Sequence, residues 1–97
     1  MKLSITKRWY GGNVNIVEQA ARELGMQLLA VKGIALEDFP GDREYVEGDA
    51  EYLFTLDAED KDEVYRRLFW HGELDKRVRT LYQQWLQAQE EKRASDI

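Results

Sequence analysis

Few side chains in this sequence could carry chemistry. Its one histidine, His71, stands beside Trp70 and could act as a general base, while Ser4 and Ser95 lie outside any nucleophile-elbow pattern. The 97 residues include no cysteine, which excludes disulfides, thiolate nucleophiles and thiolate metal sites. A histidine at a helix junction more often packs or caps locally than catalyses. We therefore expect a protein that is not an enzyme and has no catalytic residues.

Two short patterns point to small ligands but have simpler structural explanations. Residues 57–63 carry five carboxylates, yet they lack the glycine and the terminal bidentate glutamate of a calcium loop. Gly11-Gly12 follows a predicted strand but matches neither a P-loop nor a dinucleotide fingerprint. Helix capping and a plain turn explain both, so we expect no cofactor and no metal. The alternative hypothesis at this point is an enzyme or small-ligand binder, and its residues would be Lys7, Arg8, Gly11, Gly12 and His71.

The strongest functional signal is a segregated negative charge. Residues 37–63 hold twelve acids and two bases, a net charge of −10, whereas the whole chain carries −5. A concentrated negative field attracts basic surfaces and speeds association with them. The candidate partner-binding residues are ten of these acids and two aromatic anchors: Glu37, Asp38, Phe39, Asp42, Glu44, Tyr45, Glu47, Asp49, Glu51, Asp57, Glu59 and Asp60. The alternative is a solvated segment whose charge only aids solubility.

Apolar periodicity predicts the strands that must position these residues. Alternation of apolar and polar side chains predicts strands at 2–10 and 50–57. Residues 26–36 are apolar on both faces, which predicts one central strand. With a helix between the first two strands, the chain opens as β-α-β, and these strands are either parallel neighbours or flank another strand. Tyr45 and Val46 form a short strand in the acidic connection or only pin it to the core.

Helical spacing predicts three helices. One covers residues 15–24, with Asn15 as N-cap and Gly25 as C-cap. Two further apolar stripes, out of phase with each other, predict helices at 60–70 and 73–92 with a bend near Gly72. One long kinked helix is the alternative.

These elements predict a small two-layer α+β domain. A three- or four-stranded sheet is covered on one face by the early helix and the C-terminal helices, within a single domain of residues 1–93 followed by a frayed tail at 94–97. The predicted core consists of Leu3, Ile5, Trp9, Ile16, Ala20, Leu24, Leu28, Ala30, Ile34, Tyr52, Phe54, Leu56, Val64, Leu68, Val78, Leu81 and Trp85.

In size, acidity and lack of catalytic residues, the chain resembles the small acidic proteins with which phages and mobile elements block host machinery, including anti-CRISPR and anti-restriction proteins. The resemblance implies a non-enzymatic inhibitor. Its acidic surface would block a basic protein surface, such as the nucleic-acid-binding site of a partner complex. Because the chain is acidic, we expect no direct binding to nucleic acid.

A different hypothesis places the contact on the C-terminal helices. Tyr82, Trp85 and Leu86 would form an apolar strip through which a small structural or regulatory subunit binds a partner, or a second copy in a homodimer. We find no apolar run that could span a membrane and no secretory signal, so we expect a cytoplasmic protein with no membrane partner.

Overall fold

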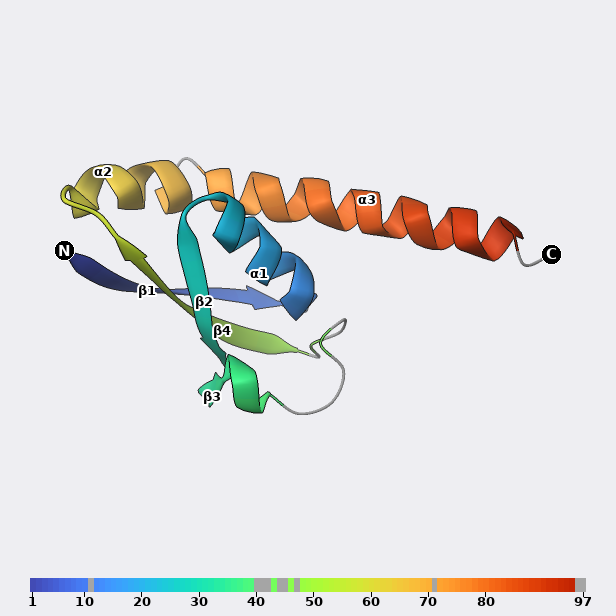
Figure 1. The fold of residues 1–97 in the computed structure, drawn as a ribbon, viewed down its shortest axis with the longest axis horizontal. Coiled ribbons are helices and arrows are strands. Elements are labelled where there is room, and N and C mark those ends of the chain that lie inside the picture. Colours follow the sequence, from blue (N-terminus) through green and yellow to red (C-terminus); the bar gives the residue numbers. More distant parts are fainter. Residues whose placement is uncertain (11, 40–42, 44–45, 47, 71, 96–97) are drawn as a thin grey trace.

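The computed structural model describes residues 1–10, 12–39, 43, 46, 48–70 and 72–95. It is an α+β fold with one antiparallel sheet, in which the strands lie in the order β1-β4-β2-β3 (Figure 1). The strands are β1 (Lys2–Tyr10), β2 (Met26–Val31), β3 (Ile34–Ala35) and β4 (Asp49–Asp57). The helical elements are α1 (Val14–Glu23), the 3-10 turn η1 (Leu36–Asp38), α2 (Lys61–Tyr65), the π-helical segment η2 (Arg66–Trp70) and α3 (Glu73–Ser95).

Strand β4 is the centre of the sheet. It pairs with β1 along nine residues and with β2 on its other side, both antiparallel, so β1 and β2 run parallel with β4 between them. This confirms the prediction that the first two strands can flank another strand. β1 is an edge strand, because no other strand among the described residues pairs with its outer side.

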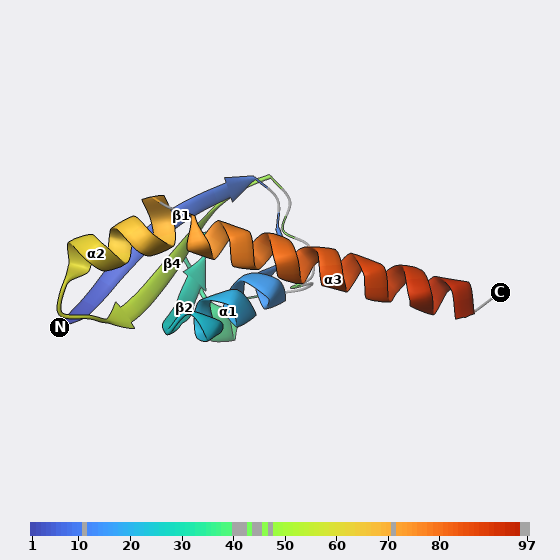
Figure 2. The same cartoon turned by 90° about the horizontal axis from the view of Figure 1, so that it is seen from above.

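The helices cover one face of the sheet, as predicted (Figures 1 and 2). Tyr52, Phe54 and Leu56 of β4 are buried on that face, and Phe69 of η2 packs edge-on against Phe54. On the other face, the alternate β1 side chains Ser4, Thr6 and Arg8 are exposed. The period of two in the sequence therefore separates a packed face from an open one.

The prediction of a single strand over residues 26–36 is wrong. The segment is a hairpin, in which Lys32 and Gly33 both have positive φ, as in a type I′ turn, and β3 folds back against β2. A bulge at Leu29 also shifts the pairing register, because Leu28 pairs with Phe54 but Ala30 pairs with Leu53. Ala30 and Ile34 are consequently only half-buried, and Val31 lies in the core instead.

The early helix starts one residue sooner than predicted, and its N-cap lies two residues sooner. Asn13, not Asn15, is the N-cap of α1, and its Oδ1 accepts a hydrogen bond of 3.2 Å from the backbone N–H of Ile16. Val14 and Val17 lie in the core beside the predicted Ile16. The guanidinium of Arg22 donates a 2.9 Å hydrogen bond to the carboxylate of Glu18, one turn earlier in the helix.

The C-terminal helices match the two-helix prediction only roughly, because residues 61–70 divide into α2 and the π-helical segment η2. Asp60 caps α2 by accepting a hydrogen bond of 3.1 Å from the N–H of Glu63, and α3 begins directly after Gly72. The structure extends α3 to Ser95, three residues past the predicted end, so residues 94 and 95 of the predicted tail are helical, and residues 96 and 97 lie outside the described residues. Leu68 and Leu74 are fully buried on either side of the break.

The connection before β4 is fixed at two described residues. Val46 is buried, and its N–H donates to the carbonyl of Gly12 at 2.8 Å. The carbonyl of Arg43 accepts a 2.7 Å bond from the N–H of Val14. Val46 thus pins the connection to the core, which was one of the two predicted alternatives; Tyr45 lies outside the described residues.

Candidate functional site

The acidic candidates that the structure describes fall into two groups. Glu37 and Asp38 on η1 and Asp49 and Glu51 at the start of β4 lie toward one end of the sheet, and all four are exposed. Phe39 beside them is partly buried and packs against the core, so it is a poor anchor for a partner. Asp42, Glu44, Tyr45 and Glu47 lie outside the described residues.

The second group lies where β4 leads into α2. Asp57, Glu59 and Asp60 are exposed there, and the first turn of α2 adds Asp62 and Glu63. Asp49 and Asp57 are the two end residues of the nine-residue strand β4, which sets them about 26 Å apart along an extended strand. The structure therefore does not gather the described carboxylates into one surface.

Several of these carboxylates already have cationic partners. Arg8 on β1 lies across the sheet from β4, with its guanidinium 3.5 Å from Asp49 and 3.8 Å from Glu51. The N-terminal ammonium donates a 2.9 Å hydrogen bond to Asp57 and, by that bond and by its charge, lowers the pKa of the Asp57 carboxyl. Exposed pairs of this kind contribute little to stability. They do reduce the negative field that a basic partner would meet.

The candidates for a small-ligand site do not converge. Lys7 and Arg8 lie on opposite faces of the sheet, because Lys7 turns toward α3 and Arg8 toward the open face. Gly12 (φ +152°) lies against Tyr52, since a Cβ there would be 2.8 Å from the Tyr52 hydroxyl, so close packing on Tyr52 explains this glycine. Gly11 and His71 lie outside the described residues.

Two further searches bear on ligands and membranes. Over the described residues, no three His, Asp or Glu side chains come together as a metal site would require. Over the same residues, no helix combines the length and the apolar character needed to cross a bilayer.

The C-terminal helices expose large aromatic and apolar side chains. Trp70 at the end of η2 is 78 % exposed and Tyr65 is 52 % exposed, with Tyr65 stacked on Phe69 at 5.6 Å between ring centroids. Farther along, Tyr82 and Leu86 of α3 are 42 % and 40 % exposed. The exposure of Trp70 was missed in the sequence, although its place directly after Leu68 and Phe69 puts it outside the apolar stripe of that helix.

The first half of α3 is tied to the rest of the fold. Asp75 accepts a 3.0 Å hydrogen bond from the indole of Trp9 and lies 3.3 Å from the ammonium of Lys7. Val78 and Leu81 pack against the core cluster. This half of the helix therefore closes the packed face of the sheet and binds both β1 and the core.

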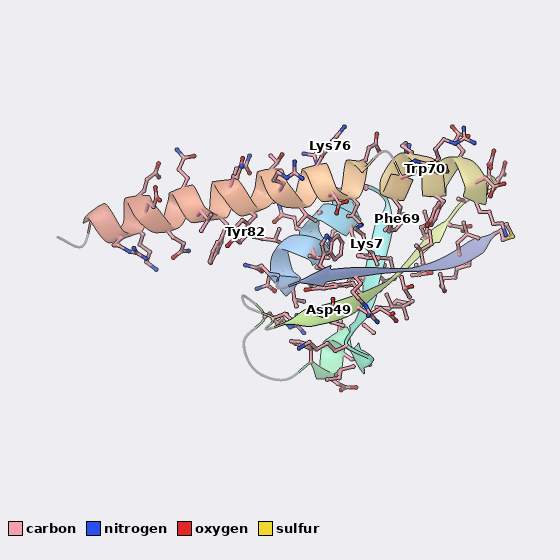
Figure 3. All side chains as sticks on the ribbon, turned by 180° about the vertical axis from the view of Figure 1, so that it is seen from behind. Lys7, Asp49, Phe69, Trp70, Lys76 and Tyr82 are labelled. Atoms are coloured by element: carbon pink, nitrogen blue, oxygen red, sulfur yellow. The ribbon has the colours of Figure 1, made fainter. Side chains whose placement is uncertain are left out.

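The second half of α3 projects from the domain. Residues 86–93 are all exposed, and the helix runs well past α1 and the sheet (Figures 1 and 2). Figure 3 shows the Lys76 side chain on the side of α3 away from the sheet and Tyr82 on the side toward it. In this outer segment, residues 82–95, every residue from 82 to 93 is exposed except Trp85.

Trp85 lies in the first turn of the outer segment. The sequence predicted it in the core, but it is half-buried, stacks on Tyr82 at 5.8 Å and lines a groove of ≈ 370 Å³ between α1 and α3. Asn15 and Gln19 of α1 form the opposite wall. The prediction failed because α1 is too short to cover the helix beyond this point.

Comparison with known proteins found no match for this chain: no family model, no curated protein sequence and no solved structure matches it. The surfaces described above are therefore the basis for assigning a function.

Proposed function

We propose that this chain is a small, non-enzymatic protein-binding subunit that associates through the outer segment of α3. The observation that carries the proposal is a helix whose residues 86–93, about two turns, are all exposed, and which exposes the large side chains of Tyr82 and Leu86 where it leaves the domain. Tyrosine is enriched among the residues that dominate binding energies at protein interfaces.

The energetics of helices in proteins support this assignment. Most of the stability of such helices comes from packing of an apolar face against other elements. Beyond Trp85, the outer segment has little such packing from its own chain, because residues 86–93 are all exposed. Packing of Tyr82 and Leu86 against another protein would supply the missing stabilisation.

A retention assay tests this function with a closely matched control. The immobilised chain is exposed to a cell lysate at low salt and at about 1 M salt, as wild type and as Tyr82→Ser/Leu86→Ser. The control, Gln83→Ser/Gln87→Ser, changes two exposed residues on the same turns with the same spacing. We expect a partner that stays bound to wild type and to the control at high salt but is not retained by the Tyr82→Ser/Leu86→Ser variant, because salt does not screen apolar contacts. Equal retention by all three chains would exclude the outer segment.

A second candidate function is the acidic inhibitor, and the corner between β4 and α2 favours it. Five exposed carboxylates lie there, and of these five only Asp57 forms an ion pair with another described group. That smaller surface, rather than the whole set of twelve candidates, would then meet a basic nucleic-acid-binding site. Reversal of Glu59 and Asp62 to Lys tests it, because an electrostatic partner would be lost both from this variant and from wild type at high salt. Unchanged retention would exclude the corner.

A further inference from the structure

We propose that the outer segment of α3 binds the same segment of a second copy, with the two helices antiparallel and centred between Gln84 and Trp85. This inference rests on the proposed function and names its partner. It follows from an uncharged stretch of α3 that has Arg79 directly before it and Glu90 directly after it.

Residues 80–89 of α3 contain no charged side chain. Four large apolar residues, Leu81, Tyr82, Trp85 and Leu86, lie in this stretch, and the rest are Thr, Gln and Ala. An antiparallel pairing about its midpoint lays the uncharged stretch of one copy against that of the other. The apolar residues of both copies then meet near the centre, where no charge has to be desolvated.

The flanking charges select the antiparallel direction. Arg79 directly precedes the uncharged stretch and Glu90 directly follows it. Eleven residues are three helical turns, so the two side chains lie on nearly the same side of the helix, about 16 Å apart along its axis. Antiparallel pairing sets Arg79 of each copy opposite Glu90 of the other, whereas a parallel pair would set arginine against arginine and glutamate against glutamate.

Both flanking residues are available for such a contact. Arg79 and Glu90 are exposed, and neither forms an ion pair with another described residue. The nearby Arg77, by contrast, lies 3.8 Å from Glu23 of α1.

The inner half of α3 is covered by α1 and β1, so the contact is limited to about three turns. Such an interface is smaller than the roughly 800 Å² per partner of a standard stable complex. We therefore expect a concentration-dependent dimer in the micromolar range or weaker.

Analytical ultracentrifugation of the whole chain over about 1 µM to 1 mM tests the proposal. Wild type is expected to pass from monomer to dimer, and Tyr82→Ser/Leu86→Ser to remain monomeric. Arg79→Glu and Glu90→Arg should each weaken dimerisation roughly tenfold, because each reversal replaces two attractive rim contacts by two repulsive ones. The double variant Arg79→Glu/Glu90→Arg restores opposite charges and should return to within about threefold of wild type. Circular dichroism confirms that these exposed substitutions leave the fold intact.

The outcomes separate this inference from the function on which it rests. Two weakened single variants without recovery in the double variant would overturn the antiparallel arrangement. A strictly monomeric wild type at 1 mM would overturn self-association, and retention of another protein through Tyr82 and Leu86 would then leave the proposed function standing. A monomer that also retains nothing through these residues would remove both.

Discussion

The two halves of α3 have similar apolar patterns but opposite surroundings. Leu74, Val78 and Leu81 recur at a spacing of four and three, and Trp85 and Ala88 continue it at four and three. In the inner half, this stripe meets α1 and the sheet, and Leu74 is fully buried. In the outer half, it continues past the end of the domain into solvent. Apolar spacing therefore indicates which side of a helix is meant to be covered, but the covering element must be found in the fold or outside it.

The largest expected effect compares one leucine from each half. Leu74→Ala should lower the free energy of unfolding by about 3 kcal/mol, because it leaves a cavity at a fully buried position. Leu86→Ala, at a position that is 40 % exposed, should cost less than about 0.5 kcal/mol. Urea denaturation at about 1 µM chain measures both, since self-association contributes little at that concentration. Similar losses at the two positions would mean that the outer half is packed by its own chain.

A smaller effect compares one acid from each half. Asp75→Ala removes the acceptor of the Trp9 indole and the partner of Lys7, and should cost about 1–2 kcal/mol. Glu90→Ala removes an exposed carboxylate near the other end of the helix and should change stability by less than about 0.5 kcal/mol. The same denaturation experiment measures both. A neutral Asp75→Ala would show that Trp9 and Lys7 do not anchor the inner half.

The smallest effect concerns the hydroxyl of Tyr52, beneath the packed region. It is buried without a hydrogen-bond partner among the described residues, and burial raises the pKa of Tyr52 above its ordinary value. Tyr52→Phe should therefore change stability by less than about 1 kcal/mol at neutral pH, and in the stabilising direction if at all. A loss well beyond that would show that the hydroxyl has a partner.

The raised pKa of Tyr52 also predicts a dependence on alkaline pH. The unfolded chain releases the tyrosine proton first, from about pH 10, so wild type loses stability as the pH rises through the folded pKa. Tyr52→Phe lacks this contribution and should decline less steeply over the same range. Thermal unfolding from pH 8 to 11 compares the two chains, and parallel curves would contradict the assignment.

The sequence predicted the fold wherever local signals agreed with the tertiary structure. β1, β4 and the break at Gly72 follow from alternation, helical spacing and a change of phase. The hairpin of β2 and β3 was missed because Lys32 adopts a left-handed conformation that its residue type disfavours. The bulge at Leu29 leaves no mark in an apolar run, and it exchanges the faces of the residues that follow.

The candidate site could be predicted only in part, for a geometric reason. Neighbouring acids in the sequence were expected to become neighbours in space, but β4 runs straight through the segment and carries Asp49 and Asp57 to opposite ends. The strip of Tyr82, Trp85 and Leu86 was visible as a pattern, since helix spacing is local. Its exposure depends on the length of α1, which no property of α3 reveals.

Lys7 on β1 has a consequence for how this protein can aggregate. β1 offers nine residues of sheet edge with which no other described strand pairs, the kind of template on which chains assemble into cross-β fibres. Lys7 points inward from that edge and is held between Trp9 and Asp75, 5.3 Å from the centre of the indole ring. A strand added alongside would seal this ammonium group away from water. Lys7 therefore disfavours uncontrolled polymerisation along β1, although this edge is long and no other described strand pairs with it.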